Sequence, residues 1–420
     1  MSELARLAGP IGCAGLALLL LATRRELRLA GLAAWALGAI GLAAYLAPTG
    51  QASLLALAAV AGGIVAAAGA ALLLRWPWVL AFATLACIPS RIPVQLGDEE
   101  ANLLLPLYAV VAALAAALGW RLLRNDSRRR ELGPLALPLA AFVAWSGLSL
   151  LWSDDLREGS ISLLAFVLPF GLLSIGFARL PWARRQLLGL YAGLTLTALA
   201  FAGTGLYQWA TRDVFWNPTV IVGNAYAPFY RVNSVFWDPS IYGRYLVVAI
   251  LATLALALLG VRGRDLAIAI FVIATLWLGL LFSFSQSSFA ALVAGVLAAA
   301  TTVWRWRAAA TLGVAAAVLT VGFATPQVRH TLLEESRSGL DNATSGRASL
   351  IGNGIRIAVA NPVAGVGVGS FKRAYADRTG LKGREPRKAA SHSTPVTVAA
   401  PSSPSTRAGA STVRPSSPRP

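Results

Sequence analysis

The chain of 420 residues is 57% hydrophobic and only 13% charged, and its formal net charge is +18. A soluble domain carries about 25% charged residues, so this composition excludes an ordinary soluble fold and indicates an integral membrane protein. Its two cysteines lie inside apolar runs and its two histidines are scattered, so neither a disulfide framework nor a bound transition metal is expected.

Twelve apolar runs carry the chain to about residue 324, and each predicts a membrane-spanning helix, which needs roughly 20 apolar residues. They lie near residues 8–23, 29–48, 52–74, 76–90, 101–123, 133–152, 159–178, 186–209, 241–261, 265–283, 286–304 and 308–324. The first and fourth are short, and they are kept because deleting either would break the alternation of arginines between the runs. The predicted fold class is all-α: a polytopic membrane protein with about twelve transmembrane helices, a long extracytoplasmic loop and a disordered C-terminal tail.

The arginines alternate between the connections. Sixteen lie after the odd-numbered runs or at the adjoining span ends: Arg24, Arg25, Arg28, Arg75, Arg121, Arg124, Arg128, Arg129, Arg130, Arg179, Arg184, Arg185, Arg262, Arg264, Arg305 and Arg307. Six lie at the N-terminus or after the even-numbered runs: Arg6, Arg91, Arg157, Arg212, Arg231 and Arg244. Short loops rich in arginine stay in the cytoplasm, so the N-terminus and the long polar segment after the last run are predicted to lie outside the cytoplasmic (inner or plasma) membrane. This placement accounts for most of the positive charge, and no nucleic-acid partner is expected.

Four parts follow from this pattern. Residues 1–210 are interpreted as a transmembrane scaffold of eight helices, and residues 211–324 as a membrane core with an outside loop and four helices. Residues 325–400 form the predicted large extracytoplasmic loop. Residues 401–420 are rich in Pro, Ser and Arg, a low-complexity composition typical of a disordered tail.

The first substantial outside loop, residues 211–240, is rich in Phe, Tyr and Trp, which suits sugar faces or a membrane interface. Three X-Pro pairs in it are expected to break helix: Asn217-Pro218, Ala227-Pro228 and Asp238-Pro239. A serine-rich turn, Ser283 to Ser288, then separates the tenth and eleventh runs. Two interpretations of this turn stay open: hydrogen bonding between helices by small hydroxyls, and lining of a substrate site.

The long outside segment contains two local patterns. Ser345 to Ala360 predicts a short helix that starts at a serine cap and ends before Asn361-Pro362. The glycines of Gly365-x-Gly367-x-Gly369 then predict a tight turn with a close backbone approach. A nucleotide-binding loop is disfavoured, because the strand, turn and helix that such a fingerprint requires are missing.

These features occur in a familiar order: Arg231 in RVNSVFWDPSIYGR, the serine-rich turn, Arg347, the NPVAGVGVGSF element at 361–371, and His392. In a twelve-span background they resemble the O-antigen ligase and polymerase family, polytopic enzymes that handle polyprenyl-diphosphate-linked glycans. The resemblance covers roughly residues 200–400.

The resemblance implies a glycan ligase or polymerase, a glycosyltransferase of the cell envelope. It would transfer a polyprenyl-diphosphate-linked oligo- or polysaccharide to an acceptor hydroxyl outside the membrane, without metal, nucleotide or other cofactor. The implied partners are that lipid-linked glycan, a glycan, lipid or protein acceptor, and membrane lipid. Carried over to this sequence, Arg231 and His392 are the implied catalytic residues.

Further roles follow from the chemistry of a departing diphosphate. Fixed cations lower the barrier by stabilising its growing charge, and the planar guanidinium of arginine pairs with phosphate oxygens. The diphosphate-binding residues are therefore expected to be Arg231, Arg244 and Arg347. Asp238, Tyr242 and Gln286 are expected to line the substrate site. A histidine such as His392 can orient the acceptor or take its proton.

The sequence departs from the family pattern in two places. The family often has an arginine after the serine of the turn, whereas this chain has Ser285-Gln286-Ser287-Ser288. After His392 the family continues into a helix and further spans, whereas here the apolar character ends at Pro401. One hypothesis is a truncated or frameshifted reading frame, which would leave the catalytic loop free at its end and put activity in doubt.

Two other functions compete with glycan transfer. A transporter or flippase for lipid-linked glycan would place charged groups at mid-membrane and often shows repeated halves. A non-catalytic membrane assembly protein is the other alternative. The spans are nearly free of charge and the polar residues gather in the predicted outside loops, which favours chemistry at the membrane surface.

Overall fold

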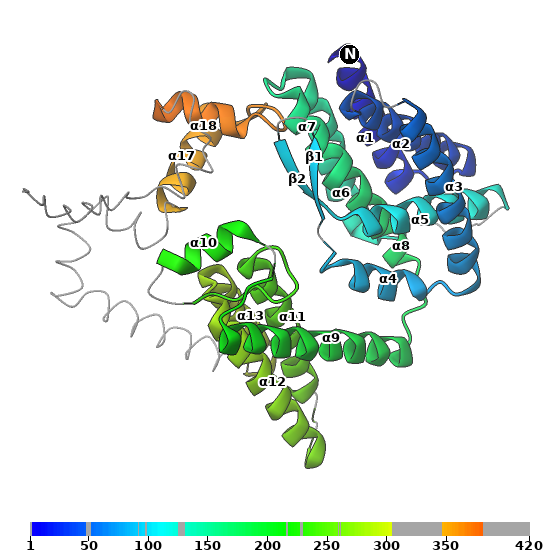
Figure 1. Ribbon diagram of the computed structural model, residues 1–420. Helices are drawn as coiled ribbons and strands as arrows, with labels where there is room; N and C mark the ends of the chain where they lie inside the picture. Colours follow the sequence, from blue (N-terminus) through cyan, green and yellow to red (C-terminus); the bar gives the residue numbers. More distant parts are fainter. Residues whose placement is uncertain are drawn as a thin grey trace, which may run out of the picture.

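The computed structural model describes residues 2–47, 52–90, 92–96, 99–124, 131–215, 217–226, 230–258, 260, 262–304 and 347–380 (Figure 1). Of these, residues 52–58, 92–96, 99–103, 300–304 and 347–348 are described by the backbone alone. Within these ranges the chain is helical apart from one antiparallel hairpin, in which β1 (Ile92–Leu96) pairs with β2 (Glu99–Leu103). The hairpin is the one departure from the predicted all-α class in the described residues. The helices are α1 (Ser2–Leu21), α2 (Arg25–Leu46), α3 (Ala52–Arg75), α4 (Val79–Cys87), α5 (Leu105–Leu123), α6 (Ala136–Leu148), α7 (Leu156–Ser162), α8 (Leu168–Ala178), α9 (Arg184–Thr211), α10 (Pro218–Tyr226), α11 (Pro239–Leu258), α12 (Arg264–Ser283), α13 (Gln286–Trp304), α17 (Arg347–Ala360) and α18 (Phe371–Thr379).

Eight helical segments of the described chain are long and apolar enough to cross a membrane. Six are single helices, namely α1, α2, α5, α9, α11 and α12. The other two are Gly133–Trp152, which extends α6 by a 3-10 turn at each end, and Leu156–Ala178, in which a π-helical stretch joins α7 to α8. They coincide with eight of the twelve predicted runs. Helices α3 and α13 follow the third and eleventh runs, and the twelfth, residues 308–324, lies outside the described residues.

The fourth predicted run, residues 76–90, does not form a helical span. Helix α4 has nine residues, about 14 Å at 1.5 Å per residue, or half of a hydrocarbon core of roughly 30 Å. A turn at Pro77 precedes the helix and Pro89 follows it, so the apolar run is interrupted at both ends. The prediction of a full-length helix here is therefore wrong.

The first eight helices pack into one bundle, the N-terminal bundle, in which α1 lies between α2 and α6, and α3 packs on α5. Small residues permit the closest approach: a Cβ built on Gly38 of α2 would lie 2.3 Å from the Cα of Gly12 of α1. Near the π-helical stretch, Pro169 lacks the N–H that would bond Ala165, and the Tyr108 hydroxyl donates to that carbonyl at 3.3 Å. The freed backbone group is thus satisfied, as a membrane interior requires.

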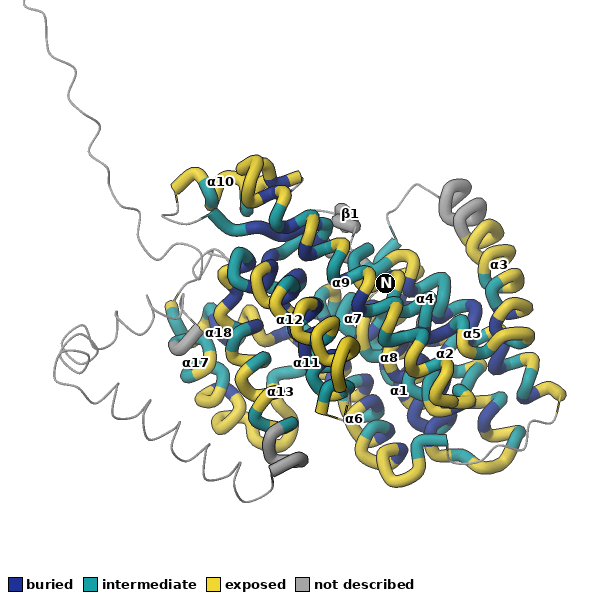
Figure 2. The backbone as a smooth tube through the Cα atoms, turned by 90° about the horizontal axis from the view of Figure 1, so that it is seen from below, coloured by how far each residue is buried: buried dark blue, intermediate teal, exposed yellow. Residues whose placement is uncertain are grey.

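Helices α9, α11, α12 and α13 form a second group, the C-terminal bundle, in which α11 contacts the other three. Its buried core includes Phe236, Tyr242, Leu246, Leu276 and Leu280. Both bundles have exposed outward faces (Figure 2). These faces carry large apolar side chains, such as Leu37 of α2, which is 66% exposed, and Phe271 of α12, which is 69% exposed. Apolar surface on this scale is unfavourable in water and suits contact with lipid.

Arginine-bearing helix ends of the N-terminal bundle meet in one place, here called the arginine-rich end. Arg28 at the start of α2 and Arg179 after α8 both contact the Glu131 carboxylate, at 2.6 and 2.9 Å. Arg25 donates to the carbonyl of Leu123, the last residue of α5, at 2.9 Å. A cavity of about 440 Å³ beside them is lined by Leu74, Pro77, Trp120, Arg121, Arg124, Arg179 and Pro181. The described helix ends next to the first, third, fifth and seventh connections therefore gather at one end of this bundle.

Candidate functional site

At one end of the C-terminal bundle, three chain segments come together, and this region is called the polar end. It comprises the last turn of α9, the loop of residues 230–240 and the turn of residues 282–288. The amide of Gln208 brackets the backbone of Ser234, donating to its carbonyl at 3.0 Å and accepting from its N–H at 2.7 Å. The backbone N–H of Val232 donates to the carbonyl of Phe282 at 3.1 Å. The α11–α12 connection with Arg262 and Arg264 lies at the opposite ends of these helices.

Two Asx-Pro pairs in this region start helices instead of breaking them. The Asn217 side chain accepts from the Thr219 N–H at 3.0 Å, and α10 begins at Pro218. Likewise, the Asp238 carboxylate accepts from the Ser240 N–H at 2.6 Å, and α11 begins at Pro239. Proline fits the first helical turn because its missing N–H would be unpaired there. Asp238, predicted to line substrate, thus caps a helix in this arrangement.

The serine-rich turn joins α12 to α13 through Phe284, whose backbone is left-handed with φ of 46°. Ser283, Ser285 and Ser288 are buried, and the hydroxyls of the last two lie 2.8 Å apart. The Ser288 hydroxyl also donates to the Ser240 carbonyl of α11 at 3.4 Å. Hydrogen bonding within the turn and between helices is thus present. Gln286, the predicted substrate-lining residue, is exposed beside these serines.

Arg231 is fixed at the polar end by its backbone. The Asn224 side chain of α10 accepts from the Arg231 N–H at 2.9 Å and donates to its carbonyl at 2.8 Å. The half-buried guanidinium points to the serine-rich turn, where its Nε donates to the Ser283 carbonyl at 3.3 Å. A cation is therefore held beside the turn that joins α12 to α13.

The remaining predicted site residues are distributed differently. Arg244 is exposed near the start of α11, and it makes no hydrogen bond or ion pair with a described residue. Tyr242 is fully buried in the core, beside Gly205 of α9 and Gly279 of α12. In this arrangement its ring packs helices together. Arg347 is the first residue of α17, and the structure describes only its backbone. His392 lies outside the described residues.

Arg212, for which the sequence predicts only a place in an outside loop, also belongs to the polar end. The guanidinium carbon of Arg212 lies 5.1 Å from the centre of the Trp209 ring and 5.0 Å from that of Tyr230. Trp209 in turn stacks on Phe282, with ring centres 4.4 Å apart. Arg212 is exposed. The aromatic residues around it were visible in the sequence, but their convergence on one cation depends on the fold.

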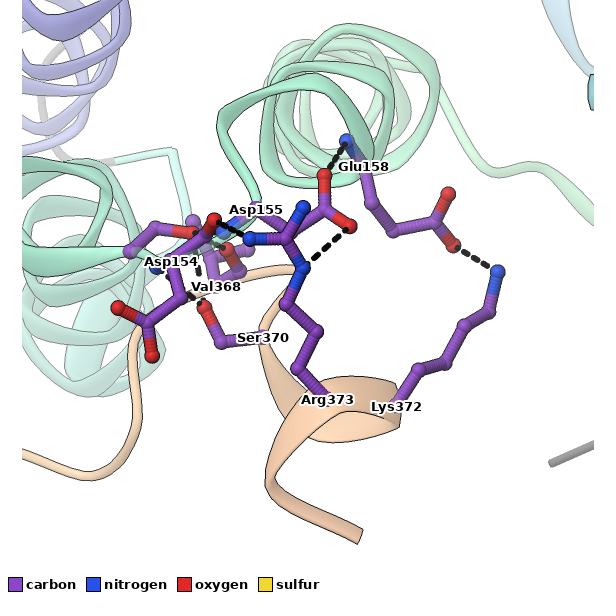
Figure 3. A network of polar contacts seen from close by, with 8 residues as sticks. Asp154, Asp155, Glu158, Val368, Ser370, Lys372 and Arg373 are labelled. Carbon is purple, nitrogen blue, oxygen red and sulfur yellow. Dashed lines mark hydrogen bonds and ion pairs between the residues drawn. The ribbon is translucent and has the colours of Figure 1, made fainter. Parts of the chain in front are cut away.

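The glycine-rich loop of residues 361–370 docks on the N-terminal bundle, against the turn between α6 and α7 (Figure 3). This contact, made by residues 149–159 and 364–373, is called the clasp. The Ser153 hydroxyl donates to the Val368 carbonyl at 2.7 Å and lies 2.9 Å from the Ser370 hydroxyl. The Ser370 hydroxyl accepts from the Asp154 N–H at 2.8 Å. Segments about 200 residues apart are thus joined by short hydrogen bonds.

Glycines make the clasp sterically possible. Gly367 and Gly369 have φ of 85° and 87°, in the left-handed region that favours glycine. A Cβ on Gly369 would lie 2.2 Å from the backbone nitrogen of Gly159, and one on Gly159 would lie 2.6 Å from the Val368 carbonyl oxygen. The close backbone approach predicted from the glycine spacing is confirmed. The glycines approach the turn between α6 and α7 and the first turn of α7.

Charged residues flank the clasp on α18. Lys372 lies 3.2 Å from Glu158, and the Arg373 Nε lies 3.7 Å from Asp155. Arg373 also donates to the Asp154 carbonyl. The helix predicted from Ser345 to Ala360 is confirmed as α17, which starts two residues later and ends at the same residue.

Comparison with known proteins agrees with the resemblance read from the sequence. Residues 269–400 match the family model described as O-Antigen ligase. The matched segment begins within α12 and contains the serine-rich turn, the glycine-rich loop and His392, whereas Arg212, Arg231 and Arg244 precede it. No curated protein and no solved structure matches the chain. The chain is therefore a multi-pass membrane protein that is O-antigen ligase-like over about a third of its length.

Proposed function

We propose that the protein transfers a glycan from a polyprenyl diphosphate to an acceptor hydroxyl at the outer face of the cytoplasmic membrane. The observation that carries this proposal is the match of residues 269–400 to O-antigen ligases, because the matched segment supplies the serine-rich turn on which Arg231 lies. A cation fixed at such a turn suits an anionic leaving group. The acceptor hydroxyl belongs to a lipid, a glycan or a protein.

The proposed step forms one bond and breaks one. The acceptor oxygen attacks the anomeric carbon, and the bond between that carbon and the diphosphate oxygen breaks. The diphosphate leaves with the electron pair and therefore gains negative charge, which Arg231 would stabilise through charge-assisted hydrogen bonds. His392 would accept the acceptor's proton. Arg244 and Arg347 stay as predicted further cations, and Gln286 as a predicted contact to the sugar or diphosphate.

The proposed orientation places the polar end and the clasp outside. The arginine count assigns the connection between α6 and α7 and the segment after the last predicted span to the same, outer side. Their direct contact in the clasp supports that assignment, because two segments on opposite sides of a bilayer could not touch. Residues 1–210 then serve as the scaffold, and residues 211–324 and 325–400 as the core and the catalytic loop.

Reconstituted protein would be tested for transfer of a lipid-diphosphate-linked glycan to candidate acceptors. We expect Arg231→Ala and His392→Ala to lower kcat by at least about a hundredfold, the scale for loss of one electrostatic or acid–base group. Arg6→Ala is the matched control, since it removes an exposed charge predicted to lie on the same side. Full transfer by both site variants would refute the assignment of these residues as the transfer site, and absence of transfer by the wild-type protein would favour a transport or assembly role.

A further inference from the structure

Arg212 is an exposed cation with a built-in orientation. It ends α9 in the left-handed conformation, with φ of 56°, and its N–H donates to the Gln208 carbonyl. The Trp209 and Tyr230 rings lie 5.1 and 5.0 Å from its guanidinium carbon. A cation that contacts two ring faces is held in place with less side-chain freedom than an ordinary surface arginine.

The Arg212 guanidinium has N–H donors that can bind a ligand. It makes no hydrogen bond or ion pair with any residue of the described chain, although Asp213 is its neighbour in sequence. Ring contacts leave the N–H groups in the guanidinium plane available, and that planar fork matches the spacing of phosphate oxygens. The contrast is with Arg28 and Arg179, whose guanidinium groups are buried against Glu131.

Its position relates it to Arg231. Trp209, which holds Arg212 on one side, stacks on Phe282 next to Ser283, the residue whose carbonyl accepts from Arg231. Tyr230, which holds Arg212 on the other side, directly precedes Arg231 in the chain. The turn itself carries no cation in Ser285-Gln286-Ser287-Ser288. Two arginines from different segments therefore flank a turn that lacks one.

We propose that Arg212 is a further diphosphate-binding residue, which contacts phosphate oxygens of the lipid-linked substrate from the α9 side while Arg231 contacts them from the loop. This assignment rests on the proposed function. The ordinary alternative is that Arg212 complements the C-terminal end of the α9 dipole or anchors the helix among lipid headgroups. Those roles need a positive charge, whereas diphosphate recognition also needs the planar fork.

The test measures binding of geranylgeranyl diphosphate to the full chain in nanodiscs, with geranylgeraniol as the probe that lacks the diphosphate. We expect Arg212→Ala to weaken diphosphate binding about tenfold, the effect of one charge-assisted hydrogen bond. Arg212→Lys should restore only part of the affinity for the diphosphate, and Arg6→Ala should lose none of it. Binding of the alcohol should not change. Arg212→Gln, of similar length, serves if the alanine variant fails to fold.

The outcomes separate this inference from the proposed function. If Arg231→Ala loses diphosphate affinity and transfer while Arg212→Ala keeps both, the inference fails and the proposed function stands. If neither variant changes binding or transfer, both the inference about Arg212 and the proposed site at Arg231 fail. If Arg212→Lys is fully active, or if the defect of Arg212→Ala disappears in nanodiscs of neutral lipid, Arg212 is a membrane anchor and the inference is overturned.

Discussion

The arginine-rich end of the N-terminal bundle and the polar end of the C-terminal bundle use arginine in opposite ways. At the arginine-rich end, Arg28 and Arg179 are nearly inaccessible, with side chains 2% and 4% exposed, and both contact the Glu131 carboxylate. At the polar end, Arg212 is exposed between two rings, and Arg231 is half-buried with its backbone fixed by Asn224. A buried, carboxylate-paired guanidinium cross-links helices, whereas one held at the surface by rings or backbone can meet a ligand. Charge alone does not separate these roles.

The largest expected effect is the loss of stability when Glu131, the partner of the two buried arginines, is substituted. Glu131→Gln removes the negative charge shared by two buried arginines, and breaking a buried ion pair from one side costs roughly 3–5 kcal/mol. We expect a markedly lower Tm in detergent. Glu26→Gln, at an exposed position on the same helix as Arg28, is the matched control and should leave Tm unchanged. Equal Tm values for the two variants would show that the buried cluster contributes little.

Acid should produce a related effect in the unchanged protein. Burial alone would raise the pKa of Glu131, but hydrogen bonds and charge from Arg28, with Arg179, bring it below its ordinary value of 4.5. A lowered pKa gives stability that is complete above 4.5 and is lost as the pH falls through the folded-state value. The Tm of the wild type should therefore drop more steeply below that pH than the Tm of Glu131→Gln. Parallel pH curves would contradict this.

A second way to sharpen the comparison is to test the clasp, which joins the glycine-rich loop to the N-terminal bundle through close backbone contacts. In Gly369→Ala the new Cβ would meet the Gly159 backbone at 2.2 Å, and φ of 87° adds strain. Gly365→Ala is the control, because it has a positive φ of 66° but open space around its Cβ. We expect Gly369→Ala, not Gly365→Ala, to expose residues 361–379 to limited proteolysis. Equal protection of the two would argue against close docking.

The clasp can also be captured chemically. The Ser153 and Ser370 hydroxyls lie 2.9 Å apart, and the two native cysteines are buried. Ser153→Cys with Ser370→Cys should therefore form an oxidised cross-link, seen as a mobility shift that reductant reverses. Cells whose outer compartment is oxidising should form it without added oxidant if the clasp lies outside. Ser146→Cys with Ser370→Cys should not cross-link, and a shift in that control would show non-specific reaction.

Local sequence patterns predicted local structure well. The run 286–304 coincides with α13, and the run 265–283 differs from α12 by one residue, because a long apolar stretch in lipid must satisfy its backbone as helix. The run 76–90 failed because Pro77 and Pro89 confine α4 to nine residues. Tyr242, predicted at the substrate, is buried because the small residues Gly205 and Gly279 of neighbouring helices leave room for its ring.

Contacts across long stretches of sequence were beyond local patterns. Glycine spacing predicted that the 365–369 backbone approaches something closely, but Gly159 lies some 200 residues earlier and carries no matching signal. The sequence indicates only that Arg212 is one of six loop arginines, because Trp209 and Tyr230 meet around it only after folding. Residues assigned by resemblance, Arg347 and His392, stay predictions. A chemical role can thus be inferred from residue type, but the partners that tune it come from tertiary packing.

The smallest expected effect concerns the charges at the clasp. Lys372 and Glu158 lie 3.2 Å apart, but their side chains are 50% and 28% exposed, and such solvent-exposed pairs contribute only about 0–1 kcal/mol. Lys372→Ala should leave protection of residues 361–379 within a factor of about five of wild type, far from the effect of Gly369→Ala. High salt should leave the wild-type clasp closed, because backbone contacts are not screened. Opening of the clasp by Lys372→Ala or by salt would mean that charge, and not glycine packing, holds the glycine-rich loop on the N-terminal bundle.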